Sequence, residues 1–115
     1  METSEVIDAL AALAQSSRLA IYRLLVEQGP AGLPAGAIAE KLDLPAATLS
    51  FHLAHLARAR LVQGRQDGRF VIYSANFQSM NALVGFLTDN CCAGASCAPT
   101  ACEAPSLSTR KERRK

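Results

Sequence analysis

The sequence predicts a mainly helical domain that carries one β-hairpin. Apolar residues recur at helical spacing through most of residues 6–60 and again after residue 76, whereas the period changes to two over residues 61–74. The chain has 115 residues, half of them hydrophobic and 19% charged, which suffices for one compact core. We therefore expect one domain in residues 1–90, followed by a different kind of segment in residues 91–115.

Two helices are predicted at the start of the chain. Helical spacing of apolar residues places the first over about residues 4–14 and the second over about residues 17–28. Ser16 and Ser17 offer a cap between them. Glycine and proline residues then interrupt the pattern over residues 28–34, where we expect a loop.

A second pair of helices follows, joined by a very short turn. The pattern resumes for two turns over residues 35–42, and Asp43 and Leu44 form a tight connection. Pro45 suits the first turn of a new helix, which should run over about residues 46–60. The buried stripe of this helix is marked by four leucines: Leu49, Leu53, Leu56 and Leu61.

The hairpin and a last helix complete the domain. β-branched and aromatic residues stand on either side of an Asp67-Gly68 turn, which predicts strands over about residues 61–65 and 69–74. Asn76 can then cap a helix that Asn90 ends. The predicted architecture is ααααββα, a winged helix-turn-helix.

The segment after residue 90 differs in composition from the domain. It is rich in small residues and proline, and it holds five Lys or Arg against two Asp or Glu, whereas residues 1–90 hold seven against eight. Such a segment is expected to be a flexible basic tail unless it binds something. No apolar run reaches the length of a membrane span, and the acidic start lacks the positive region of a signal peptide. We expect a cytoplasmic protein without a membrane partner.

Residues 46–75 have a charge pattern that suits DNA. They hold four arginines against Asp67 alone, in a domain that is otherwise acidic: Arg58, Arg60, Arg65 and Arg69. In a winged helix-turn-helix the second helix of the short-linked pair enters the major groove, and the hairpin contacts the backbone. The alternative for the arginines alone is an ordinary solvated surface.

The motifs resemble the ArsR/SmtB family of bacterial winged-helix metalloregulators over about residues 6–90. The resemblance lies in the Ser-x-His-Leu-x-x-Leu helix from Ser50 to Leu56, the Leu61-Val62 pair after it, and the Gly-Arg-x-Val-x-Tyr strand from Gly68 to Tyr73. It implies a homodimeric repressor that binds a palindromic operator in double-stranded DNA and releases it when an inducer binds.

The DNA-contacting residues follow from this resemblance and from the charge pattern. Ser50 and His52 match DNA-facing positions of the family, Arg69 matches its wing arginine, and Arg18 matches an arginine that opens the second helix. Ser and Gln, which members often carry before this helix, are replaced here by Pro45 and Ala46, so base readout depends on the helix itself. The full expected set is Arg18, Thr48, Ser50, Phe51, His52, His55, Arg65 and Arg69.

For two of these residues the alternative stays open. His52 is predicted on an exposed helix face between Ser50 and Phe51, with a core histidine as the alternative. His55 is either a backbone contact or a solvated side chain.

The last helix predicts a dimer, because it carries more apolar surface than so small a domain can cover by itself. We expect it to pack against its copy in the partner, with the first helix beside it. The expected interface residues are Leu10, Leu13, Met80, Leu83, Val84, Phe86 and Leu87.

The four cysteines predict a thiolate site. All of them lie within twelve residues, whereas a disulfide framework would spread them over the fold: Cys91, Cys92, Cys97 and Cys102. Thiolates suit thiophilic ions, and trivalent arsenic takes three sulfurs in a pyramid. Structural zinc prefers four tetrahedral ligands from separate Cys-x2–4-Cys pairs, whereas this Cys-Cys-x4-Cys-x4-Cys run has two adjacent ligands that compete for space. We therefore favour As(III), with Sb(III) as a close chemical relative, over zinc.

The resemblance supports this ligand, because atypical arsenic-responsive members place thiolates just after the last helix, starting with a Cys-Cys pair. The family's other known sites are absent, since the third helix has no cysteine and residues 76–90 have no histidine. Cys91 and Cys92 should both ligate; Cys97 is the predicted third ligand, and Cys102 is the alternative, because the longer loop costs only ~0.6 kcal/mol.

Other functions remain as alternatives. Within the same fold, the rival is a thiol-redox or zinc- or cadmium-responsive repressor. From a different class, the rival is a thiol-rich arsenic or metal carrier. We expect neither an enzyme nor an organic cofactor, because the sequence has no phosphate loop, carboxylate pair or Ser-His-acid set.

Overall fold

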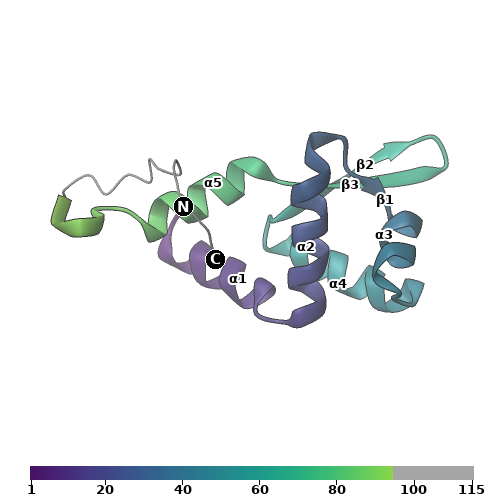
Figure 1. The fold of residues 1–115 in the computed structure, drawn as a ribbon, viewed down its shortest axis with the longest axis horizontal. Helices are drawn as coiled ribbons and strands as arrows, with labels where there is room; N and C mark the ends of the chain where they lie inside the picture. The colour runs from purple at the N-terminus through teal and green to yellow at the C-terminus, as the bar shows by residue number, and fades with distance from the viewer. Residues whose placement is uncertain (95–115) are drawn as a thin grey trace, which may run out of the picture.

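The protein is represented by a computed structural model, which describes residues 1–94. Residues 95–115 lie outside the described residues, and so do the predictions made for Cys97, Cys102 and the flexible basic tail. The described part has the predicted order of elements: four helices, a hairpin and a last helix (Figure 1). None of its helices combines the length and apolar character that crossing a membrane requires.

The two N-terminal helices are confirmed to within about a residue. They are α1 (Thr3–Leu13) and α2 (Ser16–Gln28). The predicted serine cap is wrong, because the side chain of Gln15 accepts a hydrogen bond of 2.9 Å from the backbone N–H of Arg18. This amide oxygen satisfies a donor that the helix leaves unpaired, so Ser16 becomes the first helical residue instead of the cap.

The short-linked pair is formed by α3 (Ala35–Leu42) and α4 (Ala46–Arg58), as predicted. Asp43 adopts a left-handed conformation (φ 54°), which ends α3 abruptly and turns the chain within three residues. Pro45 stands immediately before α4, where its missing N–H costs no helical hydrogen bond.

The end of α4 comes two residues before the predicted one. Arg60 is left-handed (φ 64°), and the N–H of Leu61 donates to the carbonyl of Leu56 at 3.0 Å, which closes the helix. The predicted apolar stripe is confirmed, since Leu49, Leu53, Leu56 and Leu61 are all buried. They form one core with Ile21 and Leu25 of α2 and Ile38 of α3.

The hairpin consists of β2 (Val62–Asp67), one residue longer than predicted, and β3 (Phe70–Ala75), which has the predicted length but begins one residue later. Asp67 pairs with Phe70, so the two-residue turn is Gly68-Arg69, one position further along than predicted. Gly68 has φ 63°, and two-residue turns between antiparallel strands require such a positive φ at their first position. The turn therefore places Arg69 at the tip of the hairpin.

A third strand, β1 (Leu33–Pro34), was not predicted. It pairs antiparallel with β3, giving the strand order β1-β3-β2, and it follows a 3-10 turn, η1 (Gly29–Ala31). Gly32 makes the pairing possible, because a Cβ at this position would lie 2.2 Å from the carbonyl oxygen of Tyr73. The region expected to be a loop therefore fixes the hairpin to the helices.

The last helix, α5 (Phe77–Leu87), ends three residues before the predicted Asn90. The predicted cap is confirmed, because the Asn76 side chain accepts a hydrogen bond of 3.2 Å from the N–H of Ser79. The same residue donates its side-chain N–H to the carbonyl of Arg60 at 3.1 Å and its backbone N–H to that of Leu61 at 2.8 Å. Asn76 thus joins the end of α4 to the start of α5.

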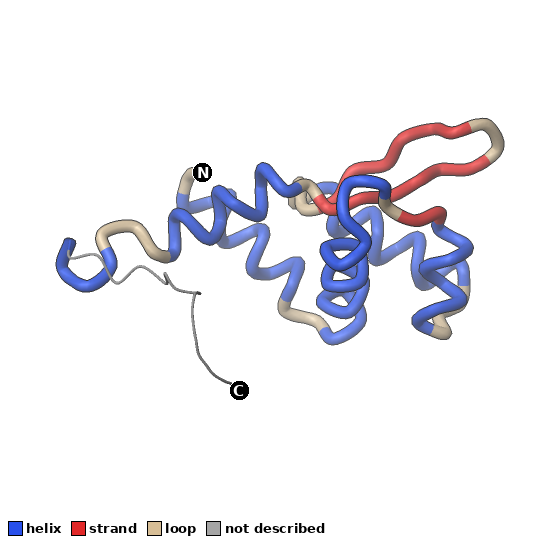
Figure 2. Tube along the Cα trace, turned by 45° about the horizontal axis from the view of Figure 1, so that its top comes forward, coloured by secondary structure: helices blue, strands red, loops and turns tan. Residues whose placement is uncertain are grey.

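The elements fall into two groups in space. Figures 1 and 2 show α1 and α5 side by side at one end, while α3, α4 and the projecting hairpin lie at the other, with α2 between them. Ala9 and Ala12 on the inner face of α1 are fully buried, which lets the helices approach closely. The arrangement separates a surface made by α1 and α5 from a surface made by α4 and the hairpin.

Candidate nucleic-acid interface

The outer face of α4 carries polar and aromatic side chains of the predicted DNA-contacting set. Thr48, Ser50 and Phe51 are all exposed, and the Phe51 side chain is 62% exposed. They occupy the first half of the helix, opposite the leucine stripe that holds α4 to the core. Thr48 and Ser50 lie on the two sides of Phe51, because residues two apart in an α-helix point about 200° from each other.

The expectation that His52 lies on an exposed face is wrong. The residue is 8% exposed and sits on the buried side of α4, with its Nδ1 atom 3.5 Å from a guanidinium nitrogen of Arg18. A helical position three residues after Leu49 and four before Leu56 belongs to the same face as those leucines. His52 therefore packs inside the domain, which was the alternative considered for it.

Arg18 reaches across the domain. Its Nε–H donates to the carbonyl of Ala12 at the end of α1, at 2.7 Å, while its terminal nitrogen approaches His52 of α4. The guanidinium thus connects the C-terminal end of α1 with the inner side of α4. The structure gives Arg18 this internal bracing contact, which the sequence analysis did not predict.

His55 lies half-buried beside a small cavity. Its Nδ1 atom is buried and has no hydrogen-bond partner among the described residues. The cavity is also lined by Asp8 and Ala11 of α1 and by Arg58 and Ala59 at the end of α4. Desolvation, followed by the positive charges of Arg18 and Arg58 and by His52, holds the pKa of His55 below its ordinary value of 6.5.

This shift predicts a loss of stability in mild acid. The folded protein binds the His55 proton less tightly than the unfolded chain does, so the free energy of unfolding should fall as the pH drops below about 6.5. Urea unfolding at pH 7.5, 6.5 and 5.5 measures the slope, and in His55→Gln the slope should be shallower. Parallel curves for the two proteins would contradict the prediction.

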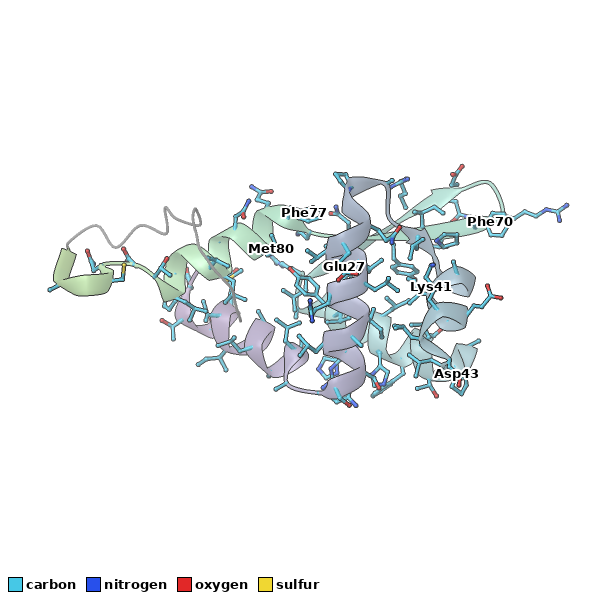
Figure 3. All side chains as sticks on the ribbon, viewed as in Figure 1. Glu27, Lys41, Asp43, Phe70, Phe77 and Met80 are labelled. Carbon is cyan, nitrogen blue, oxygen red and sulfur yellow. The ribbon has the colours of Figure 1, made fainter. Side chains whose placement is uncertain are left out.

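The hairpin supplies basic side chains next to α4. Arg65 and Arg69 are both exposed, and Arg65 also donates to the carbonyl of Ala31 at 3.2 Å. Figure 3 shows Phe70 beside the hairpin tip, well away from Phe77 and Met80 of α5. A guanidinium at the tip of a projecting hairpin has the reach and charge for a phosphate contact.

The end of α4 adds two arginines. Arg58 is exposed, and Arg60 forms a 4.0 Å ion pair with Glu5 of α1 through a mostly exposed side chain. The predicted charge pattern included both residues, but the predicted DNA-contacting set did not. Both arginines line a cavity together with Glu5 and Asp8 of α1, so their positive charges face carboxylates of the same chain.

The predicted dimer residues divide into two groups. Leu83 is only 7% exposed and packs in the core of its own chain, so its assignment to an interface is wrong. Leu13 and Met80 are half-buried against the same core. The exposed members are Leu10 of α1 and three residues of α5: Val84, Phe86 and Leu87.

One further exposed apolar residue was missed by the sequence analysis. Ile7 of α1 is exposed and stands one turn before Leu10. The signal that identifies it is its i, i+3 spacing with Leu10, on a helix face about 100° from that of the buried Val6 and Ala9. We call Ile7, Leu10, Val84, Phe86 and Leu87 the α1–α5 apolar set.

Of the predicted thiolate residues, Cys91 and Cys92 begin a 3-10 turn, η2 (Cys91–Gly94), beyond the end of α5. Cys91 is exposed. Among the side chains described in residues 1–94, no three His, Cys, Asp or Glu form a group that could hold a metal ion. Cys97, the predicted third ligand, and Cys102, its alternative, fall outside these residues.

Comparison with known proteins places the chain among bacterial regulators. A family model described as a helix-turn-helix domain matches residues 13–65. The nodulation protein NolR of Rhizobium meliloti is 35% identical over 80 residues, which are 70% of this chain and 63% of NolR. The chain therefore spans less than two thirds of the length of this curated relative.

Two solved structures share the fold. HlyU of Vibrio cholerae is 30% identical, with a TM-score of 0.63 over 76% of this chain and 95% of HlyU. A Mycobacterium bovis domain is 28% identical, with a TM-score of 0.60 over 83% of this chain and 88% of that one. It is described as a homodimeric winged helix-turn-helix DNA-binding domain and a possible ArsR-family transcriptional regulator.

Proposed function

Because the chain belongs to the ArsR family of winged-helix transcriptional regulators, we propose that it is a repressor that binds operator DNA as a homodimer. The observation that carries the proposal is the outer face of α4, where Thr48, Ser50 and Phe51 are exposed beside a hairpin that bears Arg65 and Arg69. A helix that presents polar side chains and is flanked by guanidinium groups matches the groove and the phosphates of a duplex.

The α1–α5 apolar set supports the homodimer. These side chains lie on the two helices at the end of the molecule away from the hairpin (Figure 1). Pairing two chains through this end would leave α4 and the hairpin of each free to contact DNA. A two-fold dimer then requires half-sites about one helical turn apart, roughly 10 base pairs.

The hairpin arginine makes a direct prediction. Arg69→Ala should weaken binding to all duplexes alike and flatten the dependence of log K on log salt by about 0.9 for each phosphate that the arginine neutralises. Fluorescence anisotropy of a labelled duplex at several salt concentrations measures both. Arg23→Ala is a charge-matched control on α2, where Arg23 pairs with Glu27 at 3.9 Å. An unchanged affinity and slope in Arg69→Ala would rule out a backbone contact by the hairpin.

The inducer we propose is trivalent arsenic, bound by Cys91, Cys92 and Cys97, with Sb(III) as a chemically similar ligand. All four cysteines of the chain lie in residues 91–102, which favours one common site. α5 ends at Leu87, and Cys91 and Cys92 begin the 3-10 turn η2, in which consecutive residues diverge by about 120°. Binding of one ion by both thiolates would therefore require this turn to unwind. Ligation would bring this segment into one conformation.

Binding of the inducer would act on DNA through α5. The cysteine segment follows α5 directly, and α5 carries part of the α1–α5 apolar set. A ligand that changes this helix changes the separation of the two α4 helices in the dimer, which is the differential interaction an allosteric effector needs. Typical coupling lowers affinity about 5- to 150-fold, enough for derepression without unfolding.

The test is a titration of the protein–duplex complex with arsenite, followed by anisotropy. The wild type should release the duplex, whereas Cys91→Ser, Cys92→Ser and Cys97→Ser should bind it equally well and keep it when arsenite is added. Cys102→Ser is the matched control and should remain inducible. Release of DNA from the three variants at the wild-type arsenite concentration would contradict the proposed site.

Further titrations separate the rivals. Release by peroxide and not by arsenite would favour a disulfide switch, in which two thiols are oxidised and peroxide is reduced to water. Release by zinc or cadmium alone would favour a zinc- or cadmium-responsive repressor. A carrier would bind arsenite but no duplex in a salt-dependent, sequence-specific way, so absence of that binding would overturn the repressor.

A further inference from the structure

The outward ridge of α4 is apolar along most of its length. Ala47, Phe51 and Ala54 are exposed and follow each other at i, i+4 and i+7, with the exposed Arg58 next in line. Such spacing puts the four side chains on one face of the helix. This face is the one turned away from the leucine stripe and the core.

The same part of α4 lacks the side chains that usually read bases. Between residues 46 and 57 the sequence has no Arg, Lys, Asn, Gln, Asp or Glu. Bidentate recognition of guanine needs Arg or Lys, and that of adenine needs Asn or Gln. The helix therefore has short hydroxyls at Thr48 and Ser50 and otherwise offers apolar surface.

Phe51 dominates this surface, and its ring is held in place. The side chain is 62% exposed, so most of a large apolar group stays in water. The rings of His52 and His55 meet it edge-on, with centroids at 5.6 and 6.4 Å. His52 in turn lies against Arg18 on the buried side of α4. The ring is thus a positioned projection on the helix.

The DNA major groove contains one apolar group that can match such a projection, the C5 methyl of thymine. The exposed arginines of the neighbouring hairpin, Arg65 and Arg69, favour a polyanionic partner over an apolar protein surface. We infer that α4 selects operators by thymine methyl groups, which pack against Phe51 between Ala47 and Ala54. This inference rests on the proposed function.

The test uses duplexes that differ by methyl groups alone. Wild-type protein first selects its preferred duplex from a random library, and each thymine is then replaced by uracil, which keeps every hydrogen bond and removes the methyl. Uracil at a contacted position in one half-site should weaken binding about fourfold, because one methyl is lost. Uracil at the same position in both half-sites should weaken binding about fifteenfold. Phe51→Ala should bind the thymine and uracil duplexes equally.

Phe70→Ala is the matched control. Phe70 is a phenylalanine with the same 62% exposure, but it stands on the hairpin instead of α4. This variant should keep the wild-type ratio between thymine and uracil duplexes, whatever its overall affinity. A change of that ratio in Phe70→Ala but not in Phe51→Ala would assign the reading to the hairpin and overturn the inference.

The remaining outcomes are also decisive. If a duplex is selected but no uracil weakens wild-type binding, the inference is overturned while the proposed function stands. If no duplex is selected at all, the proposed function fails and the inference falls with it. Circular dichroism checks the fold of Phe51→Ala, and should that variant not fold, the uracil series on the wild type alone decides.

Discussion

Val84→Glu should convert the protein from a dimer to a folded monomer and weaken duplex binding at least about a hundredfold. Val84 is 54% exposed on α5, so the carboxylate harms nothing inside one chain. In a symmetric interface the substitution would bury two unpaired charges, at a cost of several kcal/mol. Each 1.4 kcal/mol is a factor of ten in affinity. Sedimentation and anisotropy measure mass and binding.

Two neighbouring variants make this result specific. Leu83→Glu changes the adjacent residue, which is 7% exposed and belongs to the core, so this variant should unfold instead of dissociating. Ala20→Glu puts the same charge on an exposed position of α2 and should stay dimeric. A dimeric Val84→Glu that binds DNA normally would remove α5 from the interface.

Gly32→Ala should cost about 3 kcal/mol or more of the free energy of unfolding. An added Cβ would lie 2.2 Å from the carbonyl oxygen and 2.9 Å from the carbonyl carbon of Tyr73, so β1 or β3 would have to move. The backbone at φ 70°, ψ −166° is also a region that essentially only glycine adopts. Small domains have only about 5–15 kcal/mol in total. Urea unfolding at fixed protein concentration measures the loss.

Gly29→Ala separates the two causes. Gly29 has nearly the same conformation (φ 76°, ψ −167°), but an added Cβ would have no neighbour within 4 Å. This variant should lose only the conformational term, about 1–3 kcal/mol, and keep the hairpin attached. Equal losses in Gly29→Ala and Gly32→Ala would show that close approach of β1 to β3 contributes nothing.

Local pattern was sufficient for most of the fold. Helices α1, α2 and α3 depend on apolar spacing that is already present in the sequence, and the structure confirms them. β1 could not be found in this way, because a two-residue strand that contains Pro34 has no period of its own. It exists only because β3 passes beside it, a long-range contact that local propensity does not record.

The candidate site was predicted less well than the fold, and His52 shows why. Leu49, His52, Leu53 and Leu56 follow the i, i+3, i+4, i+7 pattern of one buried face, so the sequence did contain the signal. The prediction of an exposed His52 followed the resemblance to the family motif instead of this pattern. For α5 the difficulty is different: apolar residues surround much of the helix, and only packing decides that Leu83 faces inward while Val84 faces out.

Asn76 connects the end of α4 with the start of α5 through hydrogen bonds. It caps α5, yet two of its four hydrogen bonds hold the carbonyl groups of Arg60 and Leu61, just beyond the last turn of α4. α5 has 11 residues and is about 16 Å long. Under the proposed function, a displacement of its far end, where the cysteines follow, would be passed through these hydrogen bonds to the end of α4.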